Sequence, residues 1–225
     1  MHRLLSLSYT YLIPLLLSAV FSLKSFRLKW PGAFRIFSVF LITTFFIEVF
    51  AIAWKWELYD TSCWHYSRSN HWIYGAFIMM RQLFFLAYFH KIIDSPEVKK
   101  MVRMSVVPFV VLAAINYFVI QTPHTVNLYT IIVANTITIL LVLLNFRQIL
   151  NEKRIINLAA STEVWIAVGT FMYYSATLPL FILFEYLTKE QPKVANSYFI
   201  INDALNVLMY TFYLISFLCK PHSLK

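Results

Sequence analysis

The chain contains very little glycine and very little charge. Three glycines among 225 residues exclude the glycine-rich loops that hold phosphates in nucleotide-binding proteins. Charged residues make up 13% of the chain and hydrophobic residues 60%, whereas a soluble domain has about a quarter of its residues charged. Apolar runs of membrane-spanning length recur between short polar breaks. The sequence therefore predicts an all-α, multi-pass integral membrane protein.

Several kinds of reactive site are missing as well. Cys63 and Cys219 fall on opposite sides of the membrane in the topology below, so no disulfide can join them within one chain. The last apolar run has no lysine that could hold a retinal, and no two of the six histidines have metal-ligand spacing within one run. No serine-centred nucleophile motif is present. We therefore expect a protein that is not an enzyme and holds neither a cofactor nor a metal.

Seven apolar runs of roughly 17 to 25 residues are each long enough to span the hydrocarbon core as a helix. We expect them to form a single seven-helix transmembrane domain over residues 1–225. The predicted helices cover residues 7–23, 34–54, 71–89, 105–121, 127–146, 163–187 and 197–219.

The basic residues predict the orientation of this bundle. Thirteen lysines and arginines fall in one set of loops and ends, and five fall in the opposite set. Because basic residues are enriched in cytoplasmic loops, the amino terminus is predicted outside and the carboxyl terminus in the cytoplasm of a cell whose inner membrane holds the protein. The net charge of +9 then reflects topology, and no nucleic-acid partner is predicted.

The two halves of the chain resemble each other weakly. Residues 70–89 and 196–217 each begin with asparagine, run through aromatic residues and a central charged or amide group, and end before a lysine. This pattern is consistent with a 3+1+3 parallel repeat, in which one linker helix joins two similar three-helix units. Few residues are identical, which leaves a repeat and an unrepeated bundle equally open.

Arg81 lies near the centre of the third run and indicates a buried polar site. Its guanidinium stays charged at ordinary pH, and a central arginine costs roughly 2.5 to 3.5 kcal/mol on insertion scales, so it is expected to face partners rather than lipid. Tyr74, Arg81 and Tyr88 are spaced by seven residues, which places them on one helix face.

Polar side chains of other runs lie at a similar depth to Arg81. Glu48 and Asp203 could balance its charge, and Asn202, Asp203, Asn206 and Tyr210 share one face of the last helix. The functional interpretation is a midplane ligand site, and the structural alternative is a set of interhelical hydrogen bonds. The predicted site comprises Glu48, Tyr74, Arg81, Asn135, Tyr173, Asn202, Asp203, Asn206 and Tyr210.

Five short segments carry a resemblance to an uncharacterised group of small bacterial seven-helix membrane proteins, which are often encoded beside sensor histidine kinases. The segments are Tyr11-Leu-Ile-Pro14, Phe46-Ile-Glu48, Trp72-Ile-Tyr74, the run 165–169 followed by Tyr173 and Ser175, and Leu205-Asn206 with Tyr210. The group tends to carry an acid in its third helix shortly after the tyrosine, whereas here Ile78 and Met79 are followed by Arg81. The resemblance implies no enzyme activity.

These observations leave two functions open. The first is a non-enzymatic sensor or signalling subunit that acts through a separate partner, such as a sensor histidine kinase or another membrane or cytoplasmic protein. The alternative is a small-solute transporter of the parallel-repeat type, like the SWEET and PQ-loop carriers, with Glu48 or Asp203 as a proton-linked group. An intramembrane lipid enzyme would need a nucleophile or metal set that the sequence lacks.

Overall fold

The protein is helical throughout the residues that the computed structural model describes, which are 9–58, 61–62, 69–151, 158–190 and 192–221. Within α8 and α9, the side chains of residues 185, 187–190 and 192–198 are not described. The main helices are α2 (Leu12–Ser22), α3 (Lys24–Arg27), α4 (Gly32–Trp56), α5 (His71–Ile92), α6 (Pro96–Ile115), α7 (Leu128–Asn151), α8 (Thr162–Glu190) and α9 (Pro192–Leu218).

Six helices, α4 to α9, are long and apolar enough to cross a membrane. This confirms the predicted all-α class and supports a multi-pass membrane protein. The first predicted span, 7–23, begins outside the described residues, and its described part, 9–23, contains the 11-residue helix α2.

Several helices extend beyond the apolar runs that predicted them. Helix α6 begins nine residues before position 105, because the Ser95 side chain accepts the Val98 backbone N–H (3.4 Å) and Pro96 opens the first turn. It continues into a five-residue π-helix, Asn116–Ile120. Helix α7 runs to Asn151 rather than 146, and α9 begins at Pro192 rather than 197. Hydrophobicity locates the membrane-embedded part of a helix, whereas caps determine where the helix starts.

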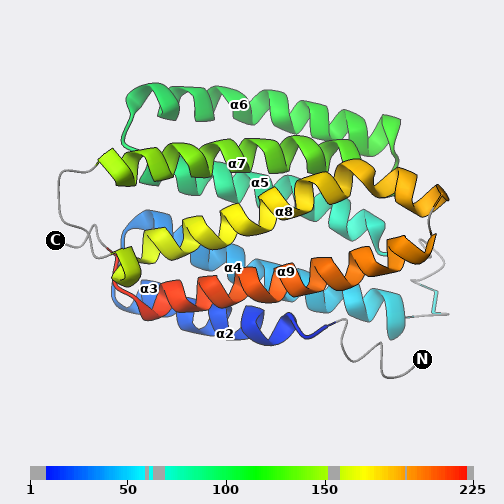
Figure 1. The fold of residues 1–225 in the computed structure, drawn as a ribbon, viewed down its shortest axis with the longest axis horizontal. Helices are drawn as coiled ribbons and strands as arrows, with labels where there is room; N and C mark the ends of the chain where they lie inside the picture. The colour runs from blue at the N-terminus through cyan, green and yellow to red at the C-terminus, as the bar shows by residue number, and fades with distance from the viewer. Residues whose placement is uncertain (1–8, 59–60, 63–68, 152–157, 191, 222–225) are drawn as a thin grey trace.

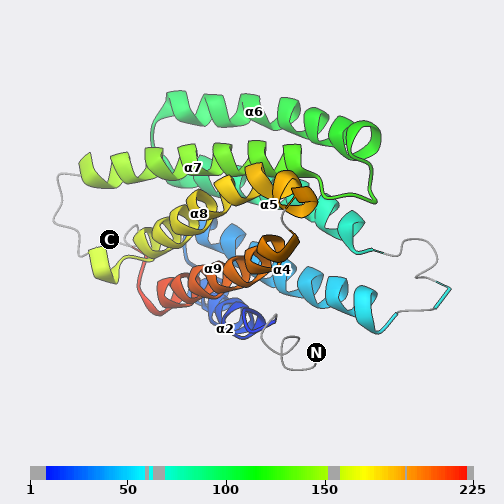
Figure 2. The same cartoon turned by 45° about the vertical axis from the view of Figure 1, so that its right-hand side comes forward.

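Six helices form a closed ring in the order α2, α4, α5, α7, α8 and α9, with α9 returning to α2. Helix α6 stands outside the ring and packs mainly against α5. Figures 1 and 2 show it at the edge of the bundle, beside α7 and α5. The interior of the ring is therefore built by the six other helices, and α6 leaves most of its apolar surface exposed.

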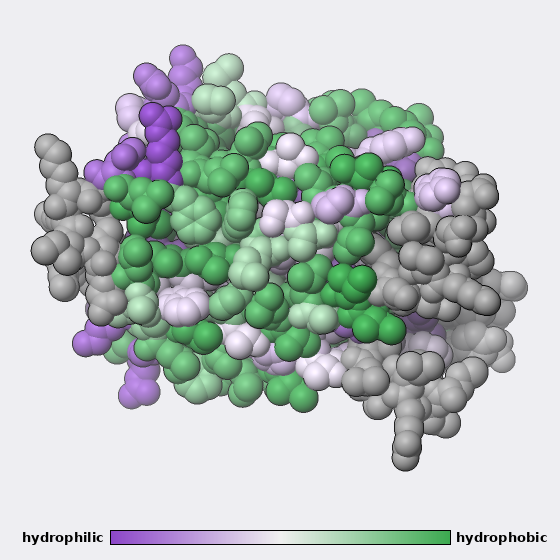
Figure 3. All heavy atoms as spheres, in the orientation of Figure 1, coloured by the Kyte–Doolittle hydropathy of each residue, from purple (hydrophilic) through white to green (hydrophobic). Residues whose placement is uncertain are grey.

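Basic residues gather at one end of the bundle, which we call the basic end. Lys24 lies over the Trp30 ring, and the Lys91 side chain lies beside Gly32. Lys220 forms a backbone β-bridge with Ser161. The α2–α4 and α5–α6 connections and the end of α9 therefore lie at this end. Figure 3 shows hydrophilic side chains at its left, around the start of α6 and near α3, and hydrophobic ones over the middle. The described basic residues of this end are Lys24, Arg27, Lys29, Arg35, Lys91, Lys99, Lys100, Arg103, Arg147 and Lys220.

Aromatic side chains fill the ring in the half nearer the basic end. Phe37 is the centre of this aromatic plug: its ring lies 4.9 Å from Tyr213, 5.2 Å from Tyr88 and 6.3 Å from Phe85. All members are 2% exposed or less, so these side chains fill the interior of the ring at this level. The plug consists of Phe34, Phe37, Phe85, Tyr88, Phe89, Tyr213 and Phe217.

Gly169 lets α8 and α9 approach closely. A Cβ atom at this position would lie 2.8 Å from the Phe212 Cβ and 3.3 Å from the Met209 carbonyl oxygen, and neither atom can move without its helix. We expect Gly169→Ala to lower the thermal stability of the purified protein by about 1 to 3 kcal/mol, as overpacking does. Gly32→Ala is the control, since its Cβ would meet only the flexible Lys91 side chain at 3.7 Å. Equal melting temperatures for the two variants would contradict the close packing of α8 on α9.

Candidate functional site

Glu48 accepts hydrogen bonds from two tyrosines inside the ring. The Tyr11 and Tyr74 hydroxyls both donate to its Oε2 atom at 2.8 Å. Glu48 is 8% exposed and Tyr11 7%. Since Tyr11 precedes α2 while Glu48 and Tyr74 belong to α4 and α5, this triad joins three neighbouring helices.

Arg81 lies on the side of α5 that faces α7 and α8. Its Nη2 donates to the Asn135 Oδ1 of α7 at 2.9 Å, and its guanidinium carbon lies 5.0 Å from the centre of the Tyr174 ring of α8. A guanidinium over an aromatic face is attracted by the negative electrostatic potential of that face. Arg81 is therefore held by an amide oxygen and an aromatic ring, and neither carries a formal charge.

The ion pairs predicted for Arg81 are not present. Among the described residues, the structure contains no ion pair within 4.0 Å between Arg81 and either Glu48 or Asp203. The reason is the order of helices in the ring: Glu48 lies on α4, while Arg81 reaches to the opposite neighbours of α5. The two charges thus belong to separate clusters.

Tyr173 of α8 lies between these clusters. Its hydroxyl donates to the Asn202 Oδ1 of α9 at 3.3 Å and also interacts with the Asn206 side chain. It interacts electrostatically with Arg81 and with Glu48. The Asn206 amide in turn donates to the Asn202 backbone carbonyl at 3.0 Å. Asn202 thus connects the predicted polar face of α9 to α8.

The two remaining predicted residues lie on the Glu48 side. The Tyr210 ring stacks on the Tyr11 ring, with 6.3 Å between their centroids. Asp203 is half-buried and interacts electrostatically with Glu48. All nine predicted residues therefore contribute to one polar layer, between the aromatic plug and the end opposite the basic one.

The Arg81 side of this layer holds more hydrogen-bond donors than acceptors. In the described part of the chain, the Arg81 Nε, Asn135 Nδ2 and Gln82 Nε2 atoms are buried and have no acceptor. Asn135 and Gln82 are fully buried, so water at the protein surface does not reach their amides. Buried donors without acceptors are costly, and here they accompany a permanent positive charge. This arrangement suits an anion or another strong acceptor.

Three contributors to the layer were not among the predicted site residues. They are Tyr11, which occurs in the first segment of the resemblance, Tyr174, whose ring contacts Arg81, and Gln82. The Gln82 Oε1 accepts from the Thr138 hydroxyl at 3.0 Å. A glutamine next to a buried arginine is the signal that could have identified it, since both need polar partners.

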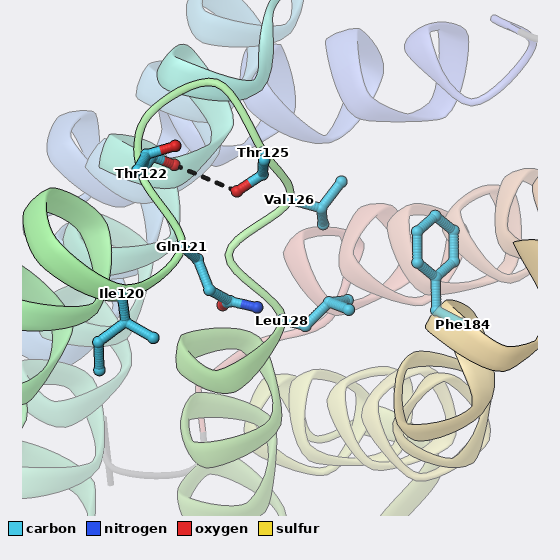
Figure 4. A pocket seen from close by; sticks show the side chains of 7 residues that line it. All are labelled: Ile120, Gln121, Thr122, Thr125, Val126, Leu128 and Phe184. Carbon is cyan, nitrogen blue, oxygen red and sulfur yellow. Dashed lines mark hydrogen bonds between the residues drawn. The ribbon is translucent and has the colours of Figure 1, made fainter. Parts of the chain in front are cut away.

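A separate pocket of about 450 Å³ opens at the end opposite the basic one (Figure 4). It lies between the α6–α7 connection and Phe184 of α8, and it contains none of the nine predicted residues. Gln121 in its wall is already engaged, because its Oε1 accepts from the Asn116 amide and from the Tyr129 backbone N–H, both at 3.1 Å. Among the described residues, no three His, Cys, Asp or Glu side chains gather to hold a metal.

Compared with models of protein families, with curated proteins and with solved structures, the chain gives no match. Its family resemblance therefore stays a prediction, and the proposed function rests on the polar layer.

Proposed function

We propose that the protein is a non-enzymatic membrane sensor or signalling subunit, which binds a small anionic or zwitterionic ligand in the polar layer and acts through a separate partner. The observation that carries this proposal is the Arg81 cluster. An arginine that stays charged and has no described acid beside it, together with unpaired amide donors, matches a ligand with a carboxylate or similar oxyanion.

The two acids of the layer, Glu48 and Asp203, favour a ligand that carries a cationic or hydroxyl group as well as an oxyanion. Glu48 and Asp203 interact electrostatically with each other, so a cationic or hydroxyl group of the same ligand would find acceptors there. Asn202 and Asn206 add amide groups to the layer beside Tyr173, and amides suit either end of such a molecule.

The position of the aromatic plug favours a sensor over a carrier. The plug closes the ring between the polar layer and the basic end, so a ligand would enter from the opposite end. We propose that the basic end is cytoplasmic, with the amino terminus outside and the protein in the inner membrane. A tag at residue 225 should then be protected from protease in intact cells, and its digestion there would reverse the orientation.

The partner that we propose is a sensor histidine kinase, following the family resemblance, or another membrane or cytoplasmic protein. Binding in the polar layer would change the packing of α8 against α9, which meet both at Tyr173–Asn202 and at the Thr170–Tyr213 hydroxyl pair (2.9 Å) near the plug. A shift of α9 would reach the basic end through Phe217, which stacks on Trp30. A partner at that end could read such a change.

A small-solute transporter is the second candidate, and the ring order favours it. Exchanging α2 with α7, α4 with α8 and α5 with α9 maps every neighbouring pair of the ring onto another neighbouring pair. This is the relation that a 3+1+3 parallel repeat with α6 as its linker would produce. A transporter would have to open the aromatic plug in each cycle.

Asp203→Asn separates the two functions, because it keeps the size of the side chain and removes its titration. Wild-type and mutant proteins are reconstituted in vesicles with a pH dye inside, and succinate, glutamate or phosphate is added outside. For a sensor we expect no solute-driven pH change with either protein, and altered partner output or thermal stability in the mutant. Proton uptake that depends on a solute in the wild type and disappears in Asp203→Asn would establish the carrier instead.

A further inference from the structure

An apolar groove of about 500 Å³ runs between α6 and α7, with Leu86 of α5 as its floor. Its walls are formed by side chains such as Val98 and Met101 on one side and Leu140 and Leu144 on the other. At one end lies Arg147. We propose that this groove holds one acyl chain of an anionic phospholipid, whose phosphate is bound by Arg147.

The groove exists because α6 contacts the bundle unevenly. Farther from the basic end, the side chains of Phe109 and Ala113 of α6 pack with those of Ile131 and Ala134 of α7 in one buried cluster. Nearer the basic end the facing residues are Val98 to Ser105 and Ile137 to Arg147, and a groove separates the helices. The groove therefore lies in the part of the α6–α7 seam nearer the basic end.

Its length matches one leaflet of a bilayer. The α7 wall extends from Ile137 to Arg147, which at 1.5 Å per residue is about 15 Å, or half of the roughly 30 Å hydrocarbon thickness. The lining is apolar except for Ser105 and Arg147, and the Ser105 hydroxyl is already bonded to the Val102 carbonyl at 2.8 Å. An acyl chain fits this lining, whereas a polar solute does not.

Arg147 provides the charge complementarity that selects a headgroup. It is exposed in the last two turns of α7, at the level where the membrane surface would lie. Asp94, in the α5–α6 connection, is engaged by Gln148, whose amide donates to its carboxylate at 3.4 Å. Basic groups between transmembrane helices at the cytoplasmic side bind anionic headgroups. The proposal does not depend on the ligand of the polar layer.

Native mass spectrometry of the full chain tests the lipid site directly. Wild type, Arg147→Gln, Leu140→Trp and Arg103→Gln are purified and exposed to equal amounts of phosphatidylglycerol and phosphatidylcholine with the same acyl chains. Arg103 is a matched control, because it is an exposed arginine of α6 at the same end that does not line the groove. Leu140 is 56% exposed, so a tryptophan there can fill the groove without disturbing the core.

We expect wild type and Arg103→Gln to retain phosphatidylglycerol about fivefold over phosphatidylcholine, the preference that one cation gives at an anionic lipid surface. Arg147→Gln should bring this ratio close to one, and Leu140→Trp should displace the retained lipid of both kinds. Equal retention of the two lipids by wild type, or a ratio that Arg147→Gln leaves unchanged, would overturn the proposal. Retention that Leu140→Trp does not reduce would place the lipid elsewhere and would overturn it equally.

Discussion

Replacing Arg81 with glutamine should strongly reduce the stabilisation of the purified protein by small oxyanions. In the wild type we expect at least one of succinate, glutamate and phosphate to raise the melting temperature at constant ionic strength. A ligand at 100 times its Kd stabilises by about 2.7 kcal/mol. Removing one partner of a buried, hydrogen-bonded charge pair costs about 2 kcal/mol or more, so the affinity of Arg81→Gln should fall at least about 30-fold.

Arg35→Gln is the matched control, because Arg35 is an exposed arginine at the basic end of α4, thirteen residues before Glu48 in the same helix. It should respond to the anions as the wild type does. If wild type, Arg81→Gln and Arg35→Gln shift equally with every anion, the effect is a general salt effect and the Arg81 site does not exist.

The separation of Arg81 from the acids predicts that substitutions of Arg81 and Glu48 act independently on stability. Because no described acid pairs with Arg81, the stability changes of Arg81→Gln and Glu48→Gln should add within about 0.5 kcal/mol, as for independent sites. An ion pair would instead make the second substitution restore what the first had lost. Recovery of folded yield in the double variant would therefore favour the Arg81–Glu48 pair that the sequence predicts.

Glu48→Leu should lower the stability of the protein strongly, and removing both tyrosine hydroxyls should restore most of the loss. The substitution leaves the Tyr11 and Tyr74 hydroxyls without their acceptor, at a cost of about 1 to 3 kcal/mol for each orphaned group. In the triple variant Glu48→Leu with Tyr11→Phe and Tyr74→Phe, no polar group of the triad remains to be orphaned. Thermal unfolding in detergent and the yield of monodisperse protein measure both effects.

The matched control for this series is Tyr129→Phe, since Tyr129 is 55% exposed and lies outside the triad. Combined with Glu48→Leu, it should restore nothing. A triple variant as unstable as Glu48→Leu alone would mean that Glu48 stabilises the ring through something other than the two phenols.

The sequence predicted the fold class well because apolar periodicity and length determine it. Six spans appear where the apolar runs are, and the errors lie at their ends. Helix α6 is the clearest case: its first turns carry Lys99, Lys100 and Arg103, which hydropathy assigns to a loop, whereas the Ser95–Pro96 cap starts a helix before them. Local capping chemistry, which a hydropathy average does not register, decided this boundary.

The common depth of several residues in the polar layer could be predicted, but their connections could not. Counting residues along each span gave a common depth for Glu48, Arg81 and Asn135, which is a property of single helices. Which of them touch depends on the order of helices around the ring and on how far each side chain bends. Tyr74 and Arg81 share a face of α5, yet one reaches α4 and the other α7. The long arginine side chain makes that divergence possible, and seven-residue spacing cannot anticipate it.

A density map of the purified protein in lipid nanodiscs, resolved well enough to show side chains and bound ions, tests the central claim most directly. We predict density for an anion or ligand acceptor at hydrogen-bond distance from the Arg81 guanidinium, next to Asn135 and over Tyr174. Glu48 should still be bound by Tyr11 and Tyr74 on the other side of the layer. A map in which the Arg81 guanidinium lies within 4.0 Å of the Glu48 or Asp203 carboxylate, with no further density beside it, would contradict the account.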